Sequence, residues 1–143
     1  MLIVLDTDVV VAAALSPTEA SRYLLREVGL GMLPAAASVP LMLEYEALLK
    51  EPETLARAGA STADVDVVMD QLSSVVRPVP LWYLWHPLLR DHDDDMVLEA
   101  AANAGATHLV TFNLREFGDL PARFGIEACL PCELARRLRD GQE

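Results

Sequence analysis

The sequence predicts an α/β fold with three layers, α/β/α, around a central parallel sheet of four or five strands. Short apolar runs that suit strands alternate with longer stretches of helical periodicity, which is typical of a parallel sheet covered on both faces. No repeat, linker or low-complexity tract interrupts the 143 residues. A chain of this length has the size of one domain, so we expect a single domain over residues 1–143.

The apolar runs and breakers place the elements in order along the chain. Strands are expected at 2–5, 35–38, 109–111 and 125–129, with an edge strand at 75–81 where Pro78 and Pro80 interrupt the pattern. Helices are expected at 18–28 with Thr18 as N-cap, at 40–48 behind Pro40, from Ser61 or Thr62 to 76, from the acidic cluster 93–95 to Gly105, and from Pro131 to 138. Residues 51–53 suggest a solvated turn.

The composition narrows the possible functions. The chain has 22 acidic and 11 basic side chains and a net charge of −11, which argues against nonspecific, counterion-driven binding to nucleic acid. It does not exclude a nucleic-acid enzyme whose acids hold divalent metals, because a bound cation inverts the local charge. No apolar run has the length of a membrane span, and Asp6 and Asp8 interrupt the N-terminal apolar run, so we expect a cytoplasmic protein.

Several acids fall where an α/β sheet binds ligands, just beyond the carboxyl ends of strands. Buried carboxylates are costly unless they are paired or bind a cation, so acids converging there would need Mg²⁺ or Mn²⁺. The candidates are Asp6, Glu44, Asp95, Asn113 and Glu116.

Each candidate also has an ordinary structural explanation. Asp6 and Asp8 could be turn residues after a strand, and Glu44 could lie on the wet side of its helix. The acids of residues 91–99 could form a solvated helix cap, although Asp95 lies on the face expected to approach the sheet. Asn113 could begin a turn that Glu116 caps.

Four segments, taken in this order and spacing, resemble a known family. They are 2–10 (LIVLDTDVV), 43–49 (LEYEALL), 90–101 (RDHDDDMVLEAA) and 105–117 (GATHLVTFNLREF). With them the chain resembles the PIN-domain ribonucleases, in particular the short single-domain toxins of toxin–antitoxin pairs.

The resemblance implies a metal-dependent nuclease in which Asp6, Glu44 and Asp95 match the acids that bind Mg²⁺ or Mn²⁺. Asn113 stands where the family often has Asp, and since its amide carries no charge, a second metal would be held more weakly. Glu116 could compensate. Asp8 stands where the family usually has Asn, and its extra carboxylate could offset the loss at Asn113.

The resemblance also implies substrate and partners. The metal-bound site would cleave single-stranded or loop RNA, with Arg115 contacting phosphate. An antitoxin protein and a homodimer would be expected. Trp82, Tyr83 and Trp85 could form either core or a docking patch for such a partner.

Two other functional classes stay open. Asp6 and Asp8 could be the nucleophile and acid of a haloacid-dehalogenase-type phosphatase, although the only lysine is Lys50 and the acidic cluster precedes Thr111. Alternatively, Asn113 could mark a nuclease-like domain that no longer cuts and instead binds RNA or protein. The spacing of Cys129 and Cys132 suits thiol redox chemistry but lacks the rest of a redox pattern.

Overall fold

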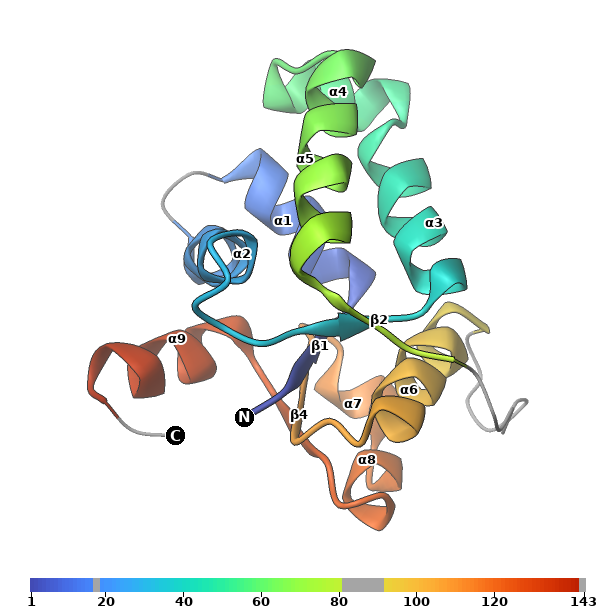
Figure 1. The fold of residues 1–143 in the computed structure, drawn as a ribbon, viewed down its shortest axis with the longest axis vertical. Helices are drawn as coiled ribbons and strands as arrows, with labels where there is room; N and C mark the ends of the chain where they lie inside the picture. Colours follow the sequence, from blue (N-terminus) through green and yellow to red (C-terminus); the bar gives the residue numbers. More distant parts are fainter. Residues whose placement is uncertain (17–18, 81–91, 142–143) are drawn as a thin grey trace.

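The computed structural model, drawn in Figure 1, describes residues 1–16, 19–80 and 92–141, and within them the strands β1 to β5 pair in parallel. Strands β1 (Ile3–Leu5), β4 (His108–Val110) and β5 (Glu127–Cys129) form one ladder, and β2 (Ala36–Ala37) and β3 (Arg77–Pro78) form a second. A bridge between Ile3 and Ala35 joins the two ladders, so the strand order is β3-β2-β1-β4-β5. The predicted parallel sheet is confirmed.

Helices cover both faces of this sheet. Figure 1 shows α2 and α9 to one side of β1 and β4, and α6, α7 and α8 to the other, while α3, α4 and α5 extend beyond one end. The helices are α1 (Thr7–Leu15), α2 (Ala20–Gly29), α3 (Val39–Leu49), α4 (Pro52–Ala58), α5 (Thr62–Val75), α6 (His92–Ala104), α7 (Leu114–Phe117), α8 (Leu120–Arg123) and α9 (Pro131–Arg139). This arrangement confirms the three-layer α/β/α prediction.

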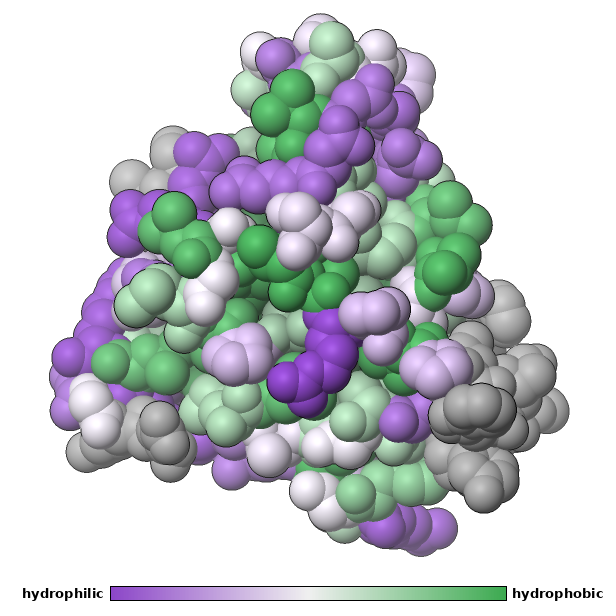
Figure 2. Space-filling model, in the orientation of Figure 1, coloured by the Kyte–Doolittle hydropathy of each residue, from purple (hydrophilic) through white to green (hydrophobic). Residues whose placement is uncertain are grey.

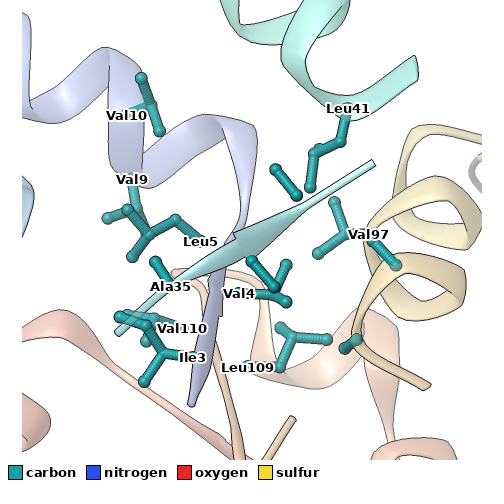
Figure 3. Close-up of a cluster of buried hydrophobic side chains, with 14 of the residues drawn as sticks. Ile3, Val4, Leu5, Val9, Val10, Ala35, Leu41, Val97, Leu109 and Val110 are labelled. Carbon is teal, nitrogen blue, oxygen red and sulfur yellow. The ribbon is translucent and has the colours of Figure 1, made fainter. Parts of the chain in front are cut away.

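The core is built around the two central strands, β1 and β4. Figure 3 shows side chains of β1 and β4 packed with others from α1, α3 and α6. These side chains are buried, and each contributes about 1.5–3 kcal/mol to folding by leaving water. They include Ile3, Val4, Val9, Leu41, Val97, Leu109 and Val110. The core thereby fixes the ends of β1 and β4 against each other, with Leu5 opposite Val110.

Several parts of the chain differ from the sequence-based expectations, among them the short helices α7 and α8, which were not expected. The turn expected at 51–53 is wrong, because α4 begins at Pro52, a residue whose fixed φ suits the first turn of a helix. Helix α1 was not expected, because Val9, Val10 and Val11 are β-branched and give the segment no clear amphipathic pattern.

Other expected features can be placed. Ser61 caps α5 as expected, in a capping box with Asp64, and Ser38 caps α3. The expected N-cap Thr18 is wrong, because Glu19 is the N-cap of α2, which begins at Ala20. The aromatic cluster of Trp82, Tyr83 and Trp85 lies outside the described residues. No helix of the described residues has the length and apolar character needed to cross a membrane.

Candidate active site at the carboxyl ends of the central strands

Asp6 lies directly after β1 and is 2% exposed. It begins α1 as its N-cap, and its Oδ1 accepts a hydrogen bond from the Thr7 backbone N–H at 2.7 Å. Its own backbone N–H donates to the Val110 carbonyl at 2.9 Å. The acid is therefore held between the strand end and the positive end of a helix dipole.

Thr111 connects Asp6 to the segment after β4. Its buried hydroxyl donates to Asp6 Oδ2 at 2.6 Å and accepts from the backbone N–H of Asn113 at 2.9 Å. Each hydroxyl can donate one hydrogen bond and accept others, so both contacts are satisfied together. Thr111 therefore fixes Asn113 beside Asp6, as the two adjacent strand ends predict.

Asp8 lies one residue into α1, and its carboxylate is half-buried. Its Oδ2 accepts from the backbone N–H of Phe112 at 3.2 Å, whereas its Oδ1 is buried and finds no hydrogen-bond partner among the described residues. Burial raises the pKa of Asp8 to about 7, and the nearby charges of Asp6 and, to a smaller extent, Asp94 add to the shift. The carboxylates of Asp6 and Asp94, which come from two distant segments of the chain, thus both act on the charge of Asp8.

Helix α6 brings two buried acids to the sheet, Asp94 at 5% exposure and Asp95 at 3%. The sequence favoured Asp95, but it is Asp94 whose charge acts on Asp8. The sequence did not single out Asp94, because α6 is buried on most sides and helical periodicity therefore could not tell which of the adjacent acids faces the sheet. The buried residues around the helix include Val97, Leu98 and Ala100. Glu99 on the same helix is also buried, at 5% exposure.

Glu44 lies on α3 and is half-buried. The next residue, Tyr45, anchors this helix to the site, because its hydroxyl donates to the carbonyl of Leu5, the residue before Asp6. Burial and the Asp6 charge raise the pKa of Tyr45 far above its ordinary value, so its hydroxyl stays protonated. Glu44 is therefore carried on a helix fixed beside Asp6, while the predicted convergence of Asp6, Glu44 and Asp95 on one metal stays a prediction.

The last three predicted residues follow β4 on or next to the short helix α7. Asn113 is its N-cap, and the side chains of Asn113, Arg115 and Glu116 are all exposed. The Glu116 backbone N–H donates to the Asn113 carbonyl at 3.1 Å, as in the turn that the sequence allowed. Unlike the buried Asp6, these three side chains are exposed, so a ligand that approaches from solvent can reach them.

The acids fit a divalent cation in chemistry, since carboxylate oxygens are the ligands that Mg²⁺ and Mn²⁺ prefer. As the described side chains stand, no three Asp, Glu, His or Cys groups are gathered in a metal-binding arrangement. The buried Oδ1 of Asp8 is an acceptor with no protein donor among the described residues, which is the position a cation would fill.

Comparison with known proteins decides the family. A model of the PIN-domain family matches residues 2–115, most of the chain. The chain belongs to the PIN-domain family. No curated protein matches it in sequence.

A solved structure supports the PIN fold independently of sequence. It is that of VapBC2 from Rickettsia felis, bound to a DNA fragment from their promoter, and the superposition gives a TM-score of 0.62. The match covers 91% of this chain and 98% of that chain at 17% identity, so the likeness is one of fold. The family match includes Asp6, Glu44, Asp94, Asp95 and Asn113 and ends at Arg115.

Proposed function

We propose that this PIN domain is a divalent-metal-dependent endoribonuclease that cleaves single-stranded or loop RNA. The observation that carries the proposal is the buried, unpartnered Oδ1 of Asp8, held within electrostatic reach of Asp6 and Asp94. Carboxylates that repel one another in a partly buried site destabilise the fold unless a cation offsets their charge. PIN-family membership favours a nuclease over the phosphatase interpretation.

Mg²⁺ or Mn²⁺ would be held by Asp6, Asp8 and Asp94, with Glu44, Asp95, Asn113 and Glu116 as the further ligands that the sequence suggested. A bound cation lowers the pKa of water and stabilises negative charge on phosphate oxygens. Thr111 and the Thr7 backbone N–H keep Asp6 in one orientation, because they donate to its Oδ2 and Oδ1 respectively, and a cation would use the remaining lone pairs of these oxygens. Arg115, exposed on α7, would contact a phosphate of the RNA.

Cleavage of a generic single-stranded RNA tests this function. Wild type should cut in Mg²⁺ or Mn²⁺ and stop in EDTA, and Asp6→Asn should reduce the rate at least 100-fold, because loss of a charged ligand weakens the whole site. Asp70→Asn is the matched control, because it removes an exposed carboxylate of α5 outside the site. Equal cleavage by wild type and Asp6→Asn would contradict the proposal.

The same assay separates the alternatives. Asn113, which is exposed and uncharged, favours a domain that binds RNA or protein without cutting it. RNA binding without metal-dependent cleavage would support that module. Release of phosphate from a small monoester would instead support the haloacid-dehalogenase-type phosphatase.

We propose further that the chain is the toxin of a toxin–antitoxin pair. The fold match is to a chain of VapBC2, and an open apolar hollow of about 470 Å³ lies between α1, α2, α4 and α5. Figure 2 shows apolar surface between α2 and α5. Leu25, Val68 and Leu72 line the hollow, and an antitoxin segment with apolar side chains would fit it. The test is a search for a small protein encoded beside this gene, which on co-expression should form a stable complex with this chain and suppress cleavage.

A homodimer is proposed on a separate surface. Val39 and Leu43 of α3 are 71% and 60% exposed, and Figure 2 shows apolar surface over α3 at its right edge. Exposed apolar side chains that share a helix face often mark an interface. Leu43→Glu should convert a dimer to a monomer in light scattering, and a wild-type monomer would exclude this arrangement.

A further inference from the structure

A second hollow, of about 380 Å³, adjoins the acid site and is separate from the one between α2 and α5. Its walls come from α1, the end of α3 and the start of α4, and include Val11, Leu15 and Leu48. Asp8 and Phe112 also line it, so the hollow is continuous with the acid site. Asp8 is the one proposed metal ligand that lines this hollow, and the rest of its lining has no part in the proposed metal chemistry.

Phe112 is the aromatic residue of this hollow. It is 45% exposed, and its backbone N–H donates to Asp8 Oδ2 at 3.2 Å. The preceding residue, Thr111, is bonded to Asp6, so two hydrogen bonds fix the position of this backbone relative to the acids. The ring is thus carried by a rigid part of the site and is still accessible to a ligand.

The charge and lining of the hollow select the kind of ligand. Glu51, which is not one of the proposed metal ligands, lines it, so a phosphate group placed there would be repelled. A neutral aromatic ring fits better, because it can stack on Phe112 and contact Val11, Leu15 and Leu48. Thr54 and Glu51 offer oxygens that accept hydrogen bonds from N–H groups at the edge of a nucleobase. A volume of about 380 Å³ lies at the lower end of ligand sites, which suits one nucleoside.

We propose that this hollow is a nucleobase subsite, in which a base next to the scissile phosphate of single-stranded RNA stacks on Phe112. The inference rests on the proposed nuclease function. To that function the subsite adds Phe112 as a positioning residue, because a base stacked on its ring would hold the neighbouring phosphate over Asp6 and Asp8. Bases of single-stranded RNA are free to enter such a site, whereas those of a duplex are not.

RNA with one abasic nucleotide at successive positions around the cleavage point tests the subsite. In wild type, one position should lower kcat/KM by about 5- to 150-fold, the range expected for the loss of one stacked base. Phe112→Ala should show a similar loss with intact RNA and no further loss at that position. Phe112→Tyr should restore the wild-type pattern, because its ring can still stack.

The controls separate stacking from folding. Met32→Ala removes an apolar side chain that is 72% exposed outside this hollow, and it should leave the abasic profile unchanged. Urea denaturation of Phe112→Ala should match wild type. Intact cleavage by Phe112→Ala would overturn the subsite, and so would a lower rate that keeps the wild-type sensitivity to the abasic position.

Failure of the nuclease proposal would be recognised separately. If wild type cleaves no RNA in Mg²⁺ or Mn²⁺, the nuclease proposal fails, and the same abasic series is then measured as equilibrium binding of a labelled oligonucleotide. A Phe112-dependent loss of affinity at one position would support the base subsite alone. The same affinity for all oligonucleotides and both proteins would overturn it.

Discussion

At the scale of single residues, Asp8 has two opposing effects on the protein. Its carboxylate lies near Asp6 and Asp94 and has one buried oxygen with no donor among the described residues, so it destabilises the fold when no cation is bound. The same charge attracts a cation. Stability and metal binding should therefore change in opposite directions when this charge is removed.

Asp8→Asn tests that relation. We expect its Mg²⁺ affinity in calorimetry to fall by about tenfold, equivalent to about 1.4 kcal/mol, and its Tm in EDTA to rise. Asp70→Asn is the control and should change neither quantity, because Asp70 is exposed on α5. An unchanged Mg²⁺ titration would count against Asp8 as a ligand.

Thr111 affects the site without carrying charge. Thr111→Val keeps the β-branched shape but removes the hydroxyl that donates to Asp6 Oδ2, so a buried carboxylate loses a donor. The free energy of unfolding should fall by about 1–3 kcal/mol in urea, and the cleavage rate should fall as well. Thr111→Ser keeps the hydroxyl and should preserve the cleavage rate. Equal cleavage rates for Thr111→Val and Thr111→Ser would show that this hydrogen bond is not needed.

The positions that sequence reasoning proposed for the site differ in how directly the sequence predicts their place in the fold. Asp6 ends an apolar strand, and the strand at 109–111 leads directly into Asn113, so both positions follow from the ends of parallel strands. The acids of α6 are different, because three consecutive Asp residues precede a helix that is buried on most sides. Only the packing of that helix shows that Asp94 acts on Asp8.

At the scale of elements, the same contrast explains which segments could be predicted. Helix α5 has a capping box at Ser61 and buried Val65, Met69 and Leu72 at helical spacing, so cap and periodicity agree. Helix α1 lacks this agreement, because its valines favour a strand. Its burial in the core outweighs this local preference, and the segment is helical. Strands β2 and β3, with two residues each, are too short to give a pattern.

Tyr45 joins two elements of the site, because it fixes α3 to the end of β1. Tyr45→Phe keeps the ring but leaves the Leu5 carbonyl without this donor, which should cost about 1–3 kcal/mol of stability in urea. Cleavage should also slow, because α3 carries Glu44. Tyr23→Phe is the control, since the Arg139 guanidinium lies 4.5 Å from its ring centroid and can contact Phe equally well. Equal losses in the two variants would contradict a specific role for Tyr45.

At the scale of the whole molecule, the reactivity of the two cysteines shows whether β5 stays paired with the rest of the sheet. Cys129 belongs to β5 and is 1% exposed, and burial together with the Glu127 charge raises its pKa to about 12. Cys132 is exposed on α9, and both thiols are free. Because the thiolate is the reactive form, the two residues should differ strongly in reactivity.

Alkylation with iodoacetamide uses the difference in reactivity between Cys129 and Cys132 to measure how often the fold opens. At about pH 8, Cys132 should react rapidly, whereas Cys129 should react only when β5 detaches, at a rate set by global unfolding. Labelling of the Cys132→Ser variant then follows Cys129 alone, and concentrated urea should make it fast. Thr111→Val should accelerate Cys129 labelling, because the Thr111 backbone N–H bonds the Cys129 carbonyl at 3.0 Å and Asp6 would lose its donor beside that contact. Rapid labelling of Cys129 in the native wild type would mean that β5 opens without the rest of the sheet.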